Sequence, residues 1–138
     1  MNVDAKYTVY KFAKFVEKEL GITKPYKLLL SEKRDDFTTF AYYNPANGLV
    51  AAYTKGRALP DVMRSVAHEM VHHFENQTGK LREKTNQDIG VYADDEFKTI
   101  DGEDIENRAN SIAGALIKKF GYANQNLDIW ANQSEDTE

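Results

Sequence analysis

The chain has 138 residues, of which 41% are hydrophobic and 29% are charged, and its formal net charge at pH 7 is −4. This composition is typical of a folded domain and argues against a disordered or fibrous chain. The absence of cysteine excludes disulfide frameworks, iron–sulfur clusters and cysteine nucleophiles, so any metal ion must be bound by nitrogen and oxygen atoms.

No segment approaches the roughly 18 apolar residues of a membrane span, and the N-terminus lacks the pattern of a secretory signal. We therefore expect a cytoplasmic protein with no membrane partner. Residues 1–34 are basic, with eight lysine and arginine residues against four acidic ones. Lys11, Lys14 and Lys18 recur at helical spacing and are interpreted as a solvated helix face. An acidic protein without clustered arginines is a poor candidate for binding nucleic acid.

The first part of the chain predicts one helix and three strands. Apolar residues recur every three or four positions from Asp4 to Leu20. Three short apolar or β-branched runs follow, at residues 26–30, 38–43 and 49–54, and turn-forming residues separate them. Because the simplest arrangement of three successive strands is an antiparallel meander, we expect an antiparallel sheet.

Two further helices are predicted in the second half of the chain. One begins near Leu59 and is followed by Gly79, a typical helix stop. The other extends from Glu103 to Phe120. Residues 80–101 between them are polar and predict a long loop, and loops of that length in compact domains are often functional.

These elements predict an α+β fold in the order helix, three-stranded antiparallel sheet, helix, long loop, helix. A chain of this length can bury roughly two thirds of the surface of its unfolded form, so one hydrophobic core is sufficient. We assign residues 1–122 to a single domain and expect residues 123–138 to form a polar, partly disordered C-terminal tail.

All three histidines lie in the sequence SVAHEMVHHFE, within the second predicted helix. His68 and His72 are four residues apart, so on a helix they point in the same direction and can bind one metal ion. Glu69 follows the first histidine, where it can accept a proton from a water molecule on the metal. The motif therefore predicts a hydrolytic site with one Zn²⁺ per chain and Glu69 as the general base.

A catalytic zinc needs a third protein ligand and an open coordination position. Since no histidine remains outside the motif, this ligand must be a carboxylate. Glu106 is the first candidate, because the small residues that follow it on the third helix permit close approach to the motif helix. Glu103, Asp94 and Asp95 remain alternative ligands. Asn110, one turn beyond Glu106, is expected to orient a ligand histidine through a hydrogen bond.

A second electrophile usually stabilises the oxyanion in hydrolytic sites of this kind. Tyr92, in the predicted loop, is the first candidate for that contact or for a contact to substrate. His73 and Tyr53 are further candidates.

The two motifs together resemble those of zincin metallopeptidases with a glutamate third ligand, and most closely the small ImmA/IrrE-like group of phages, mobile elements and bacteria. The residues that carry the resemblance are His68, Glu69, His72, Glu106, Ala109, Asn110, Ala113 and Leu116. The similarity covers residues 45–120. It implies a zincin fold and a peptide or protein substrate that pairs with the edge strand, here residues 49–54, by β-addition.

The chain also departs from that family. Larger, thermolysin-like members carry an aspartate where this chain has Asn110, and many ImmA/IrrE-like proteins have an added sensing domain, so neither secretion nor signal sensing is carried over. If the chain is phage-encoded, we expect it in the host cytoplasm or the virion. Two other functions remain open: a catalytically silent zincin-like module that binds a peptide or protein, and a virion-associated structural protein.

Overall fold

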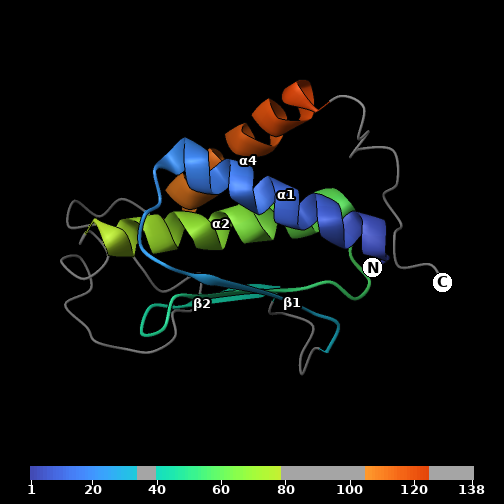
Figure 1. Cartoon of the computed structure of the whole chain (residues 1–138), viewed down its shortest axis with the longest axis horizontal. Coiled ribbons are helices and arrows are strands. Elements are labelled where there is room, and N and C mark those ends of the chain that lie inside the picture. The colour runs from blue at the N-terminus through green and yellow to red at the C-terminus, as the bar shows by residue number, and fades with distance from the viewer. Residues whose placement is uncertain (34–39, 79–104, 125–138) are drawn as a thin grey trace.

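The computed structural model describes residues 1–33, 40–78 and 105–124. These residues form the elements α1 (Val3–Leu20), β1 (Lys27–Ser31), β2 (Ala41–Asn44), β3 (Leu49–Tyr53), α2 (Leu59–Gln77) and α4 (Ile105–Ala123). The three helices lie on the same side of the three-stranded sheet (Figure 1). The predicted α+β class is confirmed.

The sheet is mixed, with the strand order β1-β3-β2. β3 pairs in parallel with β1 and antiparallel with β2. In the parallel pair Lys27 lies opposite Leu49 and Ser31 opposite Tyr53, and in the antiparallel pair Ala41 lies opposite Ala52 and Asn44 opposite Leu49. Among the described residues, the two edges of the sheet are therefore β1 and β2.

This topology corrects two expectations. The sheet is not purely antiparallel, because β1 and β3 run in the same direction. Residues 49–54 are not an edge strand, because β3 within them is hydrogen-bonded on both sides. Burial gives the physical reason: Val50, Ala51 and Ala52 are 0%, 1% and 0% exposed, so both faces of β3 are covered, which suits a central strand.

The turn between β2 and β3 is fixed to the start of β1. Gly48 has a φ of +70°, and a side chain there would come within 2.8 Å of the carbonyl oxygen of Pro25. The Gly48 amide donates to the carbonyl of Asn44, and the Lys27 amide donates to the carbonyl of Gly48, both at 2.9 Å. Glycine is therefore required by both the backbone conformation and the close approach.

The helix boundaries agree with the periodicity to within a few residues. The Asn2 side chain caps α1 by accepting a hydrogen bond from the Ala5 amide at 2.7 Å, and Gly21 ends the helix at a φ of +77°. α4 continues past the predicted end at Phe120 to Ala123. The predicted loop and residues 125–138 of the predicted tail lie outside the described residues.

Aromatic rings join α1 to α4 in the core. The Phe120 ring lies edge-on to those of Phe12 and Phe15, with centroid distances of 5.1 and 5.4 Å. Such pairs contribute packing energy beyond the area that they bury. None of the helices in the described part of the chain has both the length and the apolar character needed to cross a bilayer.

Candidate metal centre

The middle of α2 is buried on almost all sides, because the helix packs against β2, β3, α1 and α4. Its apolar residues Val66 and Met70 are fully inaccessible. The same packing buries the polar residues of the motif: His68 is 6% exposed and Glu69 and His72 are each 1% exposed. Buried imidazole and carboxylate groups are costly unless they contact one another or a metal ion.

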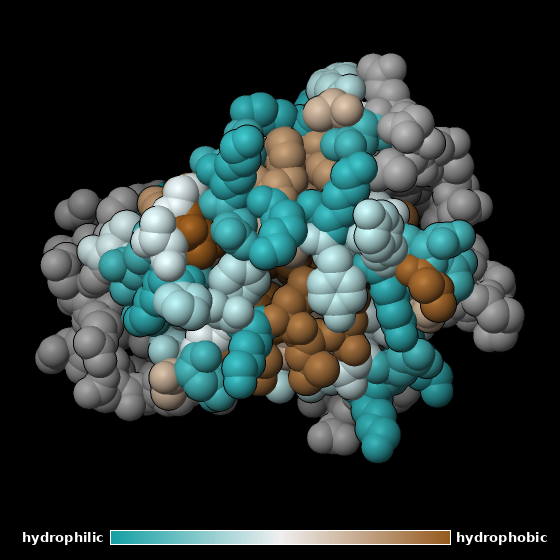
Figure 2. Space-filling view, in the orientation of Figure 1, coloured by the Kyte–Doolittle hydropathy of each residue, from teal (hydrophilic) through white to brown (hydrophobic). Residues whose placement is uncertain are grey.

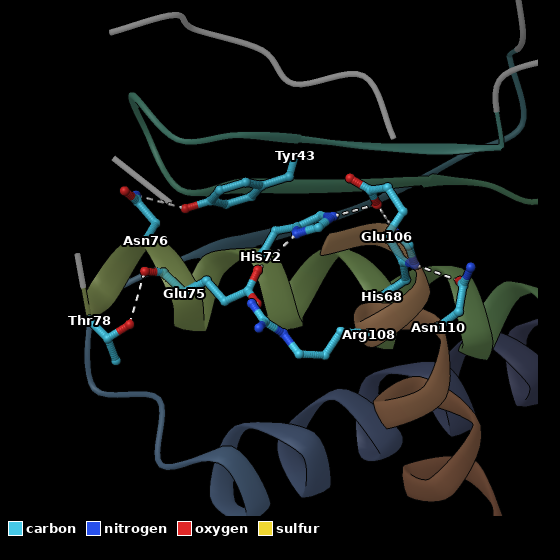
Figure 3. A network of polar contacts seen from close by, with 9 residues as sticks. All are labelled: Tyr43, His68, His72, Glu75, Asn76, Thr78, Glu106, Arg108 and Asn110. Carbon is cyan, nitrogen blue, oxygen red and sulfur yellow. Dashed lines mark hydrogen bonds and ion pairs between the residues drawn. The ribbon is translucent and has the colours of Figure 1, made fainter. Parts of the chain in front are cut away.

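The structure brings the three predicted ligands together. Glu106 Oε1 lies 2.6 Å from Nε2 of His68 and 2.9 Å from Nε2 of His72 (Figure 3). One potential ligand atom from each of the three residues lies within 4.8 Å of the other two. Ala109 and Ala113 are fully buried on α4, and these small side chains let α4 approach α2 closely. The site thus joins the two helices.

The outer nitrogen of each ligand histidine also contacts an oxygen. His68 Nδ1 lies 2.7 Å from Oδ1 of Asn110, the contact expected from the spacing of α4. His72 Nδ1 lies 3.3 Å from Oε1 of Glu75. An N–H on each Nδ1 satisfies these acceptors, and histidines that bind metals typically have such partners.

Glu75 is a site residue that sequence reasoning missed. It is 4% exposed, and its second carboxylate oxygen, Oε2, accepts a hydrogen bond from Arg108 Nη2 at 2.6 Å. A chain of contacts therefore runs from His72 through Glu75 to Arg108 on α4 (Figure 3). Because Glu75 follows His72 by three residues on a helix, the sequence could have predicted the contact between them.

The carboxylates dominate the electrostatics of the centre. Burial alone lowers the pKa of His72, but hydrogen bonds to Glu106 and Glu75 and the charges of Glu69 and Glu106 raise it to about 10. Burial raises the pKa of Glu106, yet the hydrogen bonds and charges of His68 and His72 bring it below its ordinary value. A proton on His72 therefore offsets part of the negative charge of the surrounding carboxylates.

The donor set fits a divalent metal ion. Two neutral imidazole nitrogens and one carboxylate oxygen are ligands that zinc and similar transition metals accept, and three protein ligands leave a coordination position for water or substrate. The oriented Nδ1 atoms add the outer hydrogen bonds that such sites use. The buried group formed by His68, His72 and Glu106 could hold a metal ion.

His73 is not available for the oxyanion contact considered for it. It is fully buried, its Nε2–H donates to the carbonyl of Lys24 at 2.8 Å, and its Nδ1 accepts from the Tyr43 hydroxyl at 2.8 Å. Burial lowers the pKa of His73 and keeps the ring neutral. Asn76 donates to the Tyr43 hydroxyl at 3.0 Å, which completes a structural network between α2 and the sheet.

Tyr53 also lies away from the centre. Side chains alternate between the two faces of a strand, and Val50 and Ala52 face the helices in the core, so Tyr53 is on the opposite face. Its ring lies 6.3 Å from that of Tyr42 on the same outer face. Tyr92, the first candidate for the oxyanion contact, and the alternative ligands Glu103, Asp94 and Asp95 lie outside the described residues.

No protein-family model, no curated protein and no solved structure matches the chain. The resemblance to the ImmA/IrrE-like zincins stays a prediction from the motifs.

Proposed function

We propose that the protein is a zinc-dependent metallopeptidase. The observation that carries this proposal is the convergence of two imidazole Nε2 atoms on one carboxylate oxygen, next to a buried glutamate on the same helix. His68, His72 and Glu106 are the proposed ligands of a single Zn²⁺. The His-Glu-x-x-His spacing supports the assignment, because it combines two ligands and a base on one helix face.

Each remaining residue has a role that follows from its position. A bound zinc ion supplies a Lewis acid that polarises the substrate carbonyl and lowers the pKa of water. Glu69 accepts the proton of the attacking water and transfers it to the leaving amine. Asn110 and Glu75 hold the two imidazole rings so that both Nε2 atoms point inward. Burial of the site excludes bulk water from the proton transfer.

We expect an extended peptide substrate along β2 rather than along the central strand β3. β2 is an edge of the sheet, and an edge strand can accept a further strand through its outward N–H and C=O groups. Tyr43 of β2 contacts His73 and Asn76, which follow His72 on α2. This strand therefore runs beside the helix that carries the ligands, as the Tyr43–Asn76 contact in Figure 3 shows.

Metal analysis together with a peptide-library digest tests the proposal. Protein purified without a metal-affinity tag should contain one zinc per chain and should cleave a subset of the peptides. Glu69→Gln should keep the metal and lose nearly all cleavage, because the amide has the shape of the carboxylate but cannot accept the proton.

Three outcomes would contradict the proposal. If the protein contains no zinc and shows no thermal shift when zinc is added, the metal assignment is wrong. Unchanged turnover in Glu69→Gln would mean that this glutamate is not the base. Zinc-loaded protein that binds library peptides without cleaving them would identify a binding module instead.

A further inference from the structure

A groove separate from the metal centre lies between α1 and β1. It has a volume of about 660 Å³, within the range of ligand-binding pockets. Its apolar and aromatic lining includes Tyr7, Tyr10, Ile22, Tyr26 and Leu28. Figure 2 shows hydrophobic surface at the centre of this face, where β1 runs beneath α1, with hydrophilic residues around it. None of the proposed metal ligands lines the groove.

The floor of the groove borders an open strand edge. β1 is an outer strand, and the Lys27 amide and the Ser31 carbonyl are both bonded on the β3 side. In a parallel pair, the N–H and C=O of one residue point to the same side of the strand, and the side alternates from residue to residue. The N–H and C=O groups of Leu28 and Leu30 therefore point away from β3. Among the described residues, no backbone group pairs with them on that side. An extended chain can therefore pair with β1.

The α1 wall of the groove is aromatic and exposed. Tyr7 and Tyr10 line it and are 69% and 45% exposed, and their i, i+3 spacing places them on one face of the helix. Large apolar side chains gathered on one exposed face are typical of interaction sites.

The rim of the groove is positively charged in a protein whose net charge is −4. Lys11, Lys14 and Lys24 line it together with one acidic residue, Glu17. The Glu17 carboxylate already accepts a hydrogen bond from the Tyr26 hydroxyl at 2.9 Å and lies 3.6 Å from the Lys14 ammonium. The remaining positive charge therefore favours an acidic ligand.

The far wall of the groove is held in place before any ligand binds. Gln77, at the end of α2, accepts hydrogen bonds from the amides of Thr23 and Lys24 at 2.7 and 2.8 Å. His73 donates to the carbonyl of Lys24. A wall ordered in advance lowers the entropic cost of binding.

We propose that this groove binds an extended, acidic peptide segment of a partner protein as an added strand beside β1. The outward N–H and C=O groups of Leu28 and Leu30 bond to the peptide backbone, alternate apolar side chains of the peptide enter the groove, and its carboxylates contact the lysine rim. A peptide uses all three features. A nucleic acid would use the lysines and tyrosines but would leave the strand edge without a partner.

Fluorescence anisotropy with a synthetic probe tests this proposal. The probe is a labelled peptide with glutamates at both ends and a central segment in which valine alternates with serine. Lys11→Glu combined with Lys24→Glu should weaken its binding by about tenfold or more, since two attractive contacts become repulsive. The matched control, Lys55→Glu combined with Lys118→Glu, makes the same change of net charge at exposed positions outside the groove and should leave binding almost unchanged. Circular dichroism checks that both double variants fold.

A second probe tests the added strand itself. The same peptide with alternate backbone nitrogens methylated keeps its charge but loses the N–H donors on one edge, and it should bind about tenfold more weakly or worse. Equal binding of the two probes would overturn the proposal, as would equal loss in the two double variants. Lysine-dependent binding of oligothymidylate without binding of the peptide would identify a nucleic-acid site and also overturn it.

The test separates this site from the metal centre. Probe binding should be the same in Glu69→Gln and in protein treated with a chelator, because the groove contains neither the base nor the ligands. If the chelator abolished probe binding, the probe would occupy the metal centre and the groove assignment would be wrong. Failure of the peptidase proposal would leave the result in the groove unchanged.

Discussion

Adjacent histidines on the two sides of α2 have their pKa values shifted in opposite directions. His72 faces α4 and the carboxylates of Glu75 and Glu106, and its pKa is raised to about 10. His73 faces the sheet, where a carbonyl and a hydroxyl contact its ring, and its pKa is lowered. Both side chains are almost fully buried. The partners, and not the depth of burial, decide which ring carries a charge.

The two sides of α2 also differ in the role that we assign to them, metal binding on one side and structural support on the other. On the α4 side, charged groups surround a place where a cation fits. On the sheet side, the neutral contacts of His73, Tyr43 and Asn76 satisfy one another. Changes on the first side should therefore alter metal affinity, and changes on the second should alter only stability.

The largest effect is expected for Glu106→Gln. This change keeps the shape but removes the charge that draws the two Nε2 atoms together. We expect zinc affinity, measured by isothermal titration calorimetry, to fall by more than the roughly 10- to 100-fold typical of residues outside the first ligand shell. Retained affinity would show that another carboxylate is the third ligand.

Without bound metal, the free energy of unfolding should depend on pH in a way that reflects the opposite pKa shifts of the two histidines. The raised pKa of His72 stabilises the folded state fully below pH 6.5, and this contribution is lost as the pH rises toward about 10. The loss should be on the order of a few kcal/mol in free energy of unfolding. His73 has a lowered pKa, so it opposes folding only as the pH falls below 6.5. Urea unfolding across this range, with a chelator present, measures both slopes.

The same comparison predicts proton release. Because zinc needs a neutral His72, binding between pH 6.5 and 10 should displace the proton that the metal-free site retains. Calorimetry in two buffers of different ionisation enthalpy counts the protons released. An uptake of protons on binding would contradict the charge state derived for His72.

Glu75→Gln should have a smaller effect than loss of a ligand. It removes the charge that contacts both His72 and Arg108 but leaves an oxygen acceptor for Nδ1. Zinc affinity should fall by about tenfold, at the low end of the range for such partners. If Glu75→Gln bound zinc as tightly as wild type, the contact of Glu75 with His72 would be only structural.

Asn110→Ala leaves no acceptor for the His68 Nδ1–H, so zinc affinity should fall by about 10- to 100-fold.

The smallest effect on the metal is expected for Tyr43→Phe. The change removes the hydroxyl that contacts His73 and Asn76, and it should lower the free energy of unfolding by about 1 to 3 kcal/mol. Zinc affinity should stay within about twofold of wild type, since changes at sites that share no partner are independent. A large loss of affinity would mean that the two sides of α2 are coupled.

The helices and the metal group were predictable from sequence because they depend on short spacings. Helical periodicity determines where His68 and His72 point, and it placed Asn110 one turn beyond Glu106. Each of these predictions involves residues within one helix. The meeting of α2 with α4 needed two further inferences: that the third ligand had to be a carboxylate, and that the small residues after Glu106 allow close approach. Glu103, Asp94 and Asp95 stayed open as alternatives.

The sheet was harder to predict because its order depends on contacts between distant segments. Successive strands often pair, yet here β3 inserts between β1 and β2. Charge gave little help: β1 begins with Lys27, but Ala41–Asn44 and Leu49–Tyr53 both lack charged residues, so composition does not show which of these two strands is central. The partners of His73 were equally hidden, since Tyr43 and Lys24 lie 30 and 49 residues away along the chain.

The spacing of the ligands along the chain has a consequence for folding. His72 and Glu106 are separated by 34 positions, so an ion bound by both closes a loop of that length. The length-dependent entropy of closing such a loop is about 3 kcal/mol. Without the ion, the packing of α4 on α2 and on α1 must offset this cost. With a bound ion, the binding energy of the metal would contribute to folding, and the stability of the packed α4 would depend on the concentration of that free metal ion.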